Sequence, residues 1–423
     1  MRFLFVHQNF PGQYRHLAAQ LARAGHEVVA IGETANLHRT PRLAGVKLYG
    51  YEAPAAAPNG FSAPVERAVN RGRRVAAGAA RLKQAGFKPD VIGAHIGWGE
   101  ALFLKDVFPE AKLLLYCEFF YQPRGADMGF DPEFPATAEK LLRLRVMNAP
   151  LLMALDAADC GLAPTRWQHH QFPAVQKPRS AVIHDGIDTD VVAPAGERDP
   201  ELINYVARNL EPYRGFHSFM RAIPEIQRRR PQARIVIVGG DEVSYSPRLP
   251  AGQTYRQRFL AELGDRIDLS RVEFRGKIPY AEYLALLRRS AVHVYLTYPF
   301  VLSWSLLEAM SAGCLVVASR TAPVEEVMRD GENGLLVDFF SPAGIAERVD
   351  YALSHQDELA PLRARARETV AERYDLRRIC LPAQLRLVHS LVNRVRSTSP
   401  DKSPSRPRPT PPPVKEKAGS TAA

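Results

Sequence analysis

A loop-to-helix segment near residue 300 carries the most distinctive chemistry in the sequence. It reads YPFVLSWSLLEAMSAG and covers 298–313. A helix that begins near Ser303 leaves free backbone N–H groups in its first turn, and these groups, with the hydroxyls of Ser303 and Ser305, suit a phosphate. Glu308 follows one to two turns later, where its carboxylate could accept both hydroxyls of a ribose. The segment predicts a nucleotide site, with a buried structural Glu as the alternative.

Two arginines six residues apart flank a tight turn in RNLEPYRG. Arg208 and Arg214 could together hold a diphosphate, because a guanidinium matches phosphate oxygens with a planar fork and keeps its charge. Two solvated arginines are the alternative. Gly240 and Lys277 follow two further expected strands and give weaker signals, since a glycine there lets the backbone approach a ligand closely.

Further candidates follow strands expected in the first half. His95 ends DVIGAH, where an imidazole could polarise a hydroxyl or accept its proton, or could simply be a capping or buried histidine. Trp98 could stack on a sugar or base, or pack in a core. Gly12 precedes an expected helix, where an anion is favoured, or forms a plain turn. The aromatic and charged loop 118–127 suits a substrate lid or an acceptor pocket, although no single polar group in it stands out.

These segments lie between regularly alternating elements. Short apolar runs predict strands and amphipathic stretches predict helices, which together indicate parallel sheets covered on both faces. Ligands bind beyond the carboxyl ends of such strands, so two doubly wound α/β domains should face an interdomain cleft. Strands are expected at 2–7, 26–32, 90–95, 112–119, about 160–165 and 180–187, and again at 203–208, 234–240, 272–276, 291–297, 314–319 and 334–339.

Length and composition agree with two domains. The chain has 423 residues, of which 46% are apolar and 24% charged, as is typical of a folded globular protein. The segment APAGERDP at 193–200 is the expected boundary. We predict domains over 1–192 and 193–360, and a helical segment over 361–395 that packs back across both. A Pro- and Lys-rich tail over 396–423 has no periodic apolar face and is expected to be disordered.

Several classes of partner and site are not expected. The net charge is +11, yet no nucleic-acid motif accompanies it, so we expect no nucleic-acid partner. The four cysteines match no zinc or redox spacing, and Asp188-Thr189-Asp190 could chelate a divalent ion but favours a turn, so no metal or other cofactor is expected. With no apolar run long enough to span a bilayer and no signal-like N-terminus, we predict a cytoplasmic protein with peripheral contact at the inner face of a membrane.

The ordered combination of these features resembles glycosyltransferase family 4, the retaining enzymes of GT-B fold. The resemblance covers about 1–390 and rests most strongly on LLEAMSAGCLVVAS at 306–319. Its other members, in order, are the Gly12 loop, His95, the HDGID turn at 184–188, Arg208 with Arg214-Gly215, and the Gly239-Gly240 turn. It implies two Rossmann-like domains, the first on the acceptor side and the second for the nucleotide sugar, with a last helix crossing back.

The resemblance implies transfer of a sugar from a nucleotide-diphosphate sugar, with retention of configuration and without a metal. The acceptor would be a glycan, a glycolipid or other lipid-linked sugar, or a small molecule, commonly in the synthesis of surface polysaccharide or glycolipid precursors. Arg208 and Arg214, the second in place of the family's usual Lys, would neutralise the leaving diphosphate, and His95 would contact the transferred sugar. The residues implied to bind the nucleotide sugar are Gly12, Gly240, Lys277, Ser303, Trp304, Ser305, Leu306 and Glu308.

The sequence departs from the family pattern at Phe300. Eight residues before Glu308 the family normally has a Glu that contacts hydroxyls of the transferred sugar. Phe300 could pack on an apolar sugar face, or a neighbour such as Tyr298 could replace the carboxylate. Two alternatives therefore stay open, an isomerase resembling sugar-nucleotide 2-epimerases and a non-catalytic nucleotide-sugar-binding protein. A glycosyltransferase remains the leading interpretation because the residues expected to bind the leaving group are present.

Overall fold

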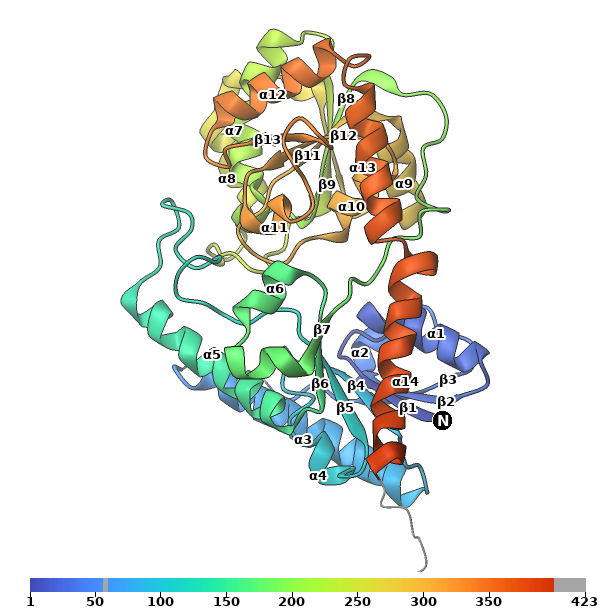
Figure 1. The fold of residues 1–423 in the computed structure, drawn as a ribbon. Helices are drawn as coiled ribbons and strands as arrows, with labels where there is room; N and C mark the ends of the chain where they lie inside the picture. Colours follow the sequence, from blue (N-terminus) through green and yellow to red (C-terminus); the bar gives the residue numbers. More distant parts are fainter. Residues whose placement is uncertain (56–59, 399–423) are drawn as a thin grey trace, which may run out of the picture.

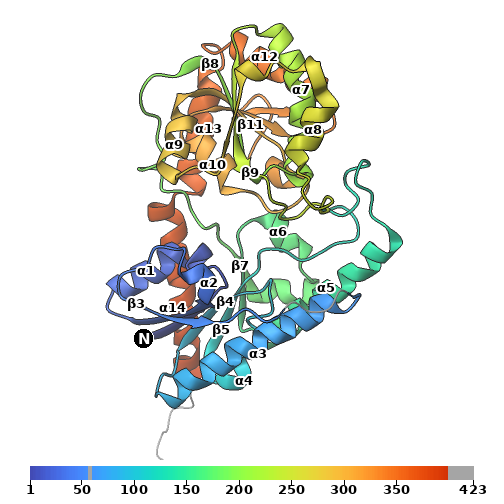
Figure 2. The same cartoon turned by 180° about the vertical axis from the view of Figure 1, so that it is seen from behind.

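The protein folds into two lobes, each built on a parallel sheet (Figures 1 and 2). The structure is a computed structural model that describes residues 1–55 and 60–398. The first lobe has a seven-stranded sheet in the order β3-β2-β1-β4-β5-β6-β7, and the second has a six-stranded sheet in the order β10-β9-β8-β11-β12-β13. This confirms the predicted pair of doubly wound α/β units. Most of the tail predicted over 396–423 lies outside the described residues.

In the first lobe the central strands are the most apolar. Phe3 to Val6 and Leu113 to Tyr116 are almost fully buried, because helices cover both faces of the sheet. The strands are β1 Arg2–Val6, β2 Glu27–Glu33, β3 Val46–Tyr51, β4 Val91–His95, β5 Lys112–Tyr116, β6 Cys160–Ala163 and β7 Ser180–Val182. The helices are α1 Arg15–Arg23, α2 Thr34–Leu37, α3 Ala63–Gln84, α4 Leu104–Val107, α5 Ala138–Ala157 and α6 Arg166–Gln171. Strand β3 was missing from the sequence prediction.

The second lobe repeats the plan and carries the helix predicted near residue 303. The Ser303 side chain caps α10 by accepting a hydrogen bond from the Ser305 backbone N–H, which fixes where this helix begins. The strands are β8 Asp199–Asn209, β9 Arg234–Gly240, β10 Val272–Gly276, β11 Ser290–Tyr295, β12 Leu315–Ser319 and β13 Leu335–Val337. The helices are α7 Phe216–Arg229, α8 Tyr255–Leu263, α9 Tyr280–Arg289, α10 Trp304–Ser311, α11 Ala322–Glu325, α12 Pro342–Ser354 and α13 Ala360–Arg373.

The chain returns to the first lobe at its C-terminal end. Helix α13 packs on α10, a π-helical turn covers Leu376–Cys380, and α14 (Leu381–Thr398) then lies against α1, β4 and β5 (Figure 1). The helical stretch predicted over 361–395 is therefore two helices with a break between them. Among the described residues, no helix combines the length and the apolar character needed to cross a bilayer.

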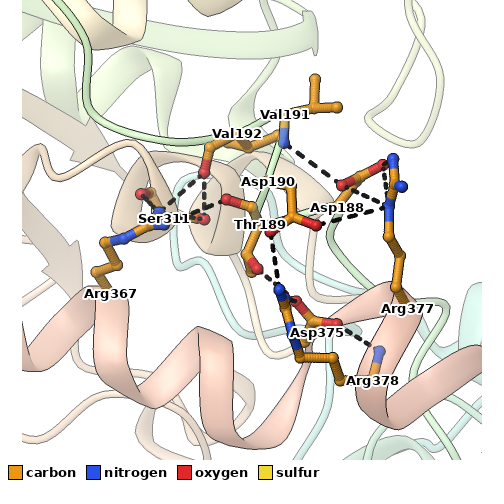
Figure 3. A network of polar contacts seen from close by, with 10 residues as sticks. All are labelled: Asp188, Thr189, Asp190, Val191, Val192, Ser311, Arg367, Asp375, Arg377 and Arg378. Carbon is orange, nitrogen blue, oxygen red and sulfur yellow. Dashed lines mark hydrogen bonds and ion pairs between the residues drawn. The ribbon is translucent and has the colours of Figure 1, made fainter.

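A polar network fixes the place where the chain passes twice between the lobes (Figure 3). Asp188 pairs with Arg377 at 2.7 Å, and Asp190 pairs with Arg378 at 3.1 Å. The buried Asp375 accepts hydrogen bonds from the Thr189 hydroxyl and from the Arg378 backbone N–H. Both aspartates of the Asp188-Thr189-Asp190 triplet are thus held by arginines from the returning segment, in agreement with the predicted turn.

Candidate functional site

The two lobes meet through residues that follow the carboxyl ends of their strands. We call this region the interlobe junction. The first lobe contributes the segment 118–134 after β5, and Asp185. The second lobe contributes the loops after β8 and β11 and the start of α10. The hydrogen bonds that cross between the lobes include those from Tyr213 Oη to Asp127 at 2.8 Å, from Tyr298 Oη to Asp131 at 2.7 Å and from Trp304 Nε1 to Asp185 at 2.8 Å.

His95 lies at the end of β4 with its side chain only 1% exposed. Its Nδ1 accepts a hydrogen bond from the Gly97 backbone N–H at 2.9 Å, so the neutral ring carries its proton on Nε2. That Nε2 lies 3.4 Å from Oε2 of Glu118, a long contact that leaves the N–H without a partner of hydrogen-bond geometry. The predicted proton-accepting role would need a free ring nitrogen, and this geometry leaves the neutral ring only a donor.

Trp98 stacks on the His95 ring, with centroids 4.0 Å apart and an interplanar angle of 19°. The sequence allowed Trp98 either to stack on a sugar or base or to pack in a core. In the structure it packs against His95, which is itself a candidate site residue. The indole thereby restricts the orientation of the imidazole, since a stacked ring cannot turn without losing the contact.

Gly12 lies in a short turn against a second buried histidine. A Cβ on Gly12 would come within 2.7 Å of the His7 ring, and its backbone has φ +45°. His7 accepts the Asn9 backbone N–H on Nδ1 and contacts Oε1 of Gln13 through Nε2 at 2.8 Å. Burial and the charge of His95 lower the pKa of His7 to about 3, so its ring is neutral at physiological pH. Gly12 is therefore required for the packing of this turn.

Arg208 extends from the end of β8 with its side chain exposed to solvent. Within residues 1–55 and 60–398, its guanidinium forms no hydrogen bond or ion pair, whereas most arginines of the second lobe have a carboxylate partner. Its positive charge still helps to lower the pKa of Glu118 in the opposite lobe. The structure thus leaves a free guanidinium at the interlobe junction, as a diphosphate site needs.

Arg214 is held by the loop that leads into α10. Its Nη1 donates to the Thr297 hydroxyl at 2.9 Å and to the Val301 carbonyl at 3.0 Å. Its guanidinium lies 5.9 Å from the ring centroids of Tyr245 and Phe300. Arg214 therefore braces the 297–301 loop, and its remaining donors are the ones open to a ligand.

Phe300 is 6% exposed and packs in an aromatic cluster. Its ring centroid lies 4.6 Å from that of Phe119 in the first lobe, 4.8 Å from that of Tyr245 and 5.5 Å from that of Tyr213. Tyr298, the neighbour that the sequence offered as a replacement for the carboxylate, donates a hydrogen bond to Asp131. Phe300 therefore makes an apolar contact between the lobes.

The start of α10 presents the polar groups that the sequence predicted. Ser303 Oγ accepts hydrogen bonds from the Ser305 backbone N–H at 3.3 Å and from the Ser305 hydroxyl at 3.0 Å. The Ser303 backbone N–H donates to the Tyr295 hydroxyl, and Leu306 is fully buried. Trp304 is 44% exposed, and its indole points to the first lobe, where it donates to Asp185.

Glu308 is buried against two tyrosines. Its Oε1 accepts from Tyr280 Oη at 2.7 Å and its Oε2 from Tyr283 Oη at 2.8 Å. Burial raises the pKa of this carboxyl, although the two tyrosine hydrogen bonds act in the opposite direction. Each oxygen of a carboxylate can accept a second hydrogen bond, so a two-point contact with a ribose remains available.

Gly240 and Lys277 come together at the ends of β9 and β10. A Cβ on Gly240 would lie 2.5 Å from Lys277 Cε and 2.7 Å from Asn209 Oδ1. Lys277 Nζ pairs with Glu242 at 2.8 Å on the surface. The structure therefore groups these two predicted residues at one corner of the second sheet.

Two functional candidates were not singled out in the sequence. Glu118 is the second residue after β5, and its oxygens face His95 and Gln13. Asp185 lies in the HDGID turn, where Oδ2 accepts from Tyr116 and Trp304 while Oδ1 has no partner among the described residues. Burial raises the pKa of Asp185 to about 7, with the Glu118 charge adding to the effect. The position of Glu118 at a strand end was the available signal, and for Asp185 it was the HDGID turn of the family resemblance.

Comparison with known proteins gives the family. Residues 24–192 match the family described as glycosyl transferase family 4 group, and residues 190–372 match the glycosyl transferases group 1. Between them, the two matches cover most of both lobes. The chain belongs to the family 4 and group 1 glycosyltransferases.

Individual relatives are distant. D-inositol 3-phosphate glycosyltransferase of Corynebacterium efficiens is 29% identical over 181 residues, which are 39% of this chain and 40% of that protein. Phosphatidyl-myo-inositol mannosyltransferase of Mycobacterium tuberculosis is 28% identical over 242 residues, 55% of this chain and 58% of that protein. The matched stretches thus span 40% and 58% of these two relatives.

Solved structures share the fold of the whole molecule. Sucrose-phosphate synthase of Thermosynechococcus elongatus has a TM-score of 0.71 at 18% identity and covers 94% of this chain and 100% of that chain. Anabaena HepE, solved with UDP, has a TM-score of 0.63 at 16% identity and covers 92% of this chain and 100% of that chain. The two sheets with their returning C-terminal helix therefore form a GT-B fold.

Proposed function

We propose that this member of the family transfers a sugar from a nucleotide-diphosphate sugar to a hydroxyl acceptor, with retention of configuration. The observation that carries the proposal is the free, exposed guanidinium of Arg208 at the interlobe junction, close enough to the first lobe for its charge to act on Glu118. The start of α10, with the hydroxyls of Ser303 and Ser305, adds polar groups on the same lobe.

The proposed reaction breaks the bond between the sugar's anomeric carbon and the diphosphate oxygen. A new bond forms between that carbon and the acceptor oxygen on the same face, and the acceptor's proton passes to the departing phosphate. Arg208, Arg214 and the start of α10 would stabilise the negative charge that develops on the diphosphate, which is a large contribution to catalysis when the donors are already in place. Glu308 would hold the ribose, and Gly12, Gly240 and Lys277 would line the site.

We propose a cyclic polyol, a glycan or a lipid-linked sugar as the acceptor class. Relatives named for inositol phosphate and phosphatidyl-myo-inositol acceptors support the proposal, as does HepE, solved with UDP, for the donor. A lipid-linked acceptor would bring the protein to the inner face of a membrane.

The test is incubation of the protein with UDP-glucose, GDP-mannose and ADP-glucose, each with and without acceptors, followed by separation of the products. We expect a glycoside and free nucleoside diphosphate only when both substrates are present. An epimerised nucleotide sugar without acceptor would instead identify an isomerase. Tight binding of a nucleotide sugar without turnover across the acceptor panel would identify a binding protein.

A further inference from the structure

A chain of polar side chains in the first lobe ends on a single carboxylate. Gln13 Oε1 accepts a hydrogen bond from His7 Nε2 at 2.8 Å, and Gln13 Nε2 in turn donates to Oε1 of Glu118 at 3.2 Å. On the other side, His95 Nε2 lies 3.4 Å from Oε2 of the same carboxylate. Because backbone N–H groups occupy Nδ1 of both histidines, the direction of every donor in this chain is fixed toward Glu118.

Glu118 is the member of this chain that reaches the interlobe junction. Its side chain is 28% exposed, whereas the His95 side chain is 1% exposed and His7 is also buried. Arg208 of the opposite lobe is near enough for its charge to act on this carboxylate. The carboxylate therefore stands between a buried hydrogen-bond network and the place where the diphosphate is proposed to bind.

The electrostatics favour an ionised Glu118 that accepts hydrogen bonds. Burial alone would raise its pKa, but the contact with His95, together with the positive charge of Arg208, acts in the opposite direction, and the pKa is lowered. A carboxylate that holds protons weakly is a poor base and a good acceptor for hydroxyl groups. The N–H of His95 beside it has no hydrogen-bond partner among the described residues and adds a donor. The pair can therefore accept a hydrogen bond from a hydroxyl and donate one to its oxygen.

We infer that Glu118 binds hydroxyl groups of the sugar at the reacting end of the site, with His95 as the neighbouring donor. The inference rests on the proposed function and names the carboxylate that recognises its substrate. It also accounts for Phe300, because a carboxylate from the first lobe makes one at position 300 unnecessary. The hydroxyls belong either to the transferred sugar or to the acceptor, and the experiment separates these two sources.

The test compares wild type with Glu118→Gln, and uses Glu133→Gln as a matched control. Glu133 lies in the same segment with the same 28% side-chain exposure, but it pairs with Arg221 and Arg258 on the second lobe. Dissociation constants are measured by calorimetry for the nucleoside diphosphate alone and for its sugar conjugate, using the donor that wild type accepts. The KM for the acceptor is measured in parallel, and unfolding midpoints verify that each variant is folded.

Loss of a charge-assisted hydrogen bond predicts at least a ten-fold weakening for the hydroxyl-bearing ligand. If the transferred sugar is the ligand, Glu118→Gln raises the dissociation constant of the sugar conjugate ten-fold or more and leaves that of the free nucleoside diphosphate within two-fold. If the acceptor is the ligand, its KM rises while both donor constants stay unchanged. Glu133→Gln changes neither. Should Glu118→Gln not fold, Glu118→Asp, which keeps the charge but withdraws it by one methylene, is expected to give the same pattern.

If wild type and Glu118→Gln have equal dissociation constants for the donor ligands and equal KM values for the acceptor, the inference is overturned while the proposed function stays intact. An equal loss for the free nucleoside diphosphate and its sugar conjugate would also overturn it, because a general electrostatic effect would then suffice. Failure of wild type to bind any nucleotide sugar would overturn the proposed function, and this inference with it.

Discussion

At the residue scale, Asp185 is a buried carboxyl that accepts two hydrogen bonds through one oxygen. Its other oxygen has no partner within the described part of the chain. Tyr116 and Trp304 both donate to Oδ2, and Trp304 comes from the other lobe. Because burial and the Glu118 charge raise its pKa to about 7, the folded protein holds this proton more tightly than the unfolded chain does. The interlobe contact is therefore coupled to pH near neutrality.

Asp185→Asn should flatten part of the pH dependence of stability. A carboxyl whose pKa is raised from 3.8 to about 7 makes the folded state less stable as the pH rises between those values, by roughly 1.4 kcal/mol for each pH unit. The amide cannot titrate, so the variant should lack this slope. Urea unfolding of both proteins at pH 5, 6 and 7 measures how the free energy of unfolding changes with pH. The same change in both proteins would show that Asp185 does not titrate in this range.

Phe300→Glu should destabilise the protein and should not improve donor binding. The new carboxylate would lie among Phe119, Tyr213 and Tyr245, and burying a charge in such a place costs about 3 kcal/mol or more, reduced if Arg214 turns toward it. Phe300→Leu is the control for loss of the ring. The free energy of unfolding in urea decides the point, and a stable Phe300→Glu variant with tighter donor binding would contradict it.

At the scale of elements, the segment 118–134 acts as a strap from the first lobe onto the second. Asp131 accepts from Tyr298 and lies 2.9 Å from His217 Nε2, and Glu133 pairs with Arg221 at 2.7 Å. Phe119 adds the apolar contact with Phe300. The loop that the sequence suggested as a lid is thus docked on the opposite lobe beside the proposed site.

Alanine substitution of two aspartates in the crossing network should lower the free energy of unfolding by very different amounts (Figure 3). Asp375 is 1% exposed and accepts from Thr189 and Arg378, so Asp375→Ala should lower the free energy of unfolding by about 2–4 kcal/mol. Asp190→Ala removes an exposed ion pair with Arg378 and should cost less than about 1 kcal/mol. Chemical denaturation compares them, and equal losses would show that the network does not depend on the buried carboxylate.

Elements with strong apolar runs could be predicted from the sequence, and weaker ones could not. The buried strands and the helix starting at Trp304 follow from apolar runs and from the capping Ser303. Strand β3 (Val46–Tyr51) was missed because an edge strand is half exposed and carries a mixed pattern. Local patterns placed Glu118 after a strand and Asp185 in the HDGID turn, but the partners of both carboxylates come from distant segments, so the sequence could not show which polar groups surround them.

At the scale of the whole molecule, two sheets are joined by two chain crossings and a strap. The strap, the Trp304–Asp185 contact and the crossing network all bridge the lobes, while Arg208 remains unpaired between them within the described ranges. A two-lobed transferase must admit its substrates and exclude water during transfer, which closure of the lobes achieves. The returning helix α14 ties the C-terminal end of the described chain to the first lobe (Figure 1).

The most direct test of the account is the rate of sugar transfer by Arg208→Ala. Arg228→Ala is the matched control, since Arg228 is an exposed arginine on α7 that pairs with Glu225 of the same helix. With the donor and acceptor that wild type uses, Arg208→Ala should reduce kcat/KM by about 100-fold or more, because the departing diphosphate loses a fixed positive charge. Its unfolding midpoint should stay close to that of wild type. Transfer by a folded Arg208→Ala at the wild-type rate would contradict the proposed site.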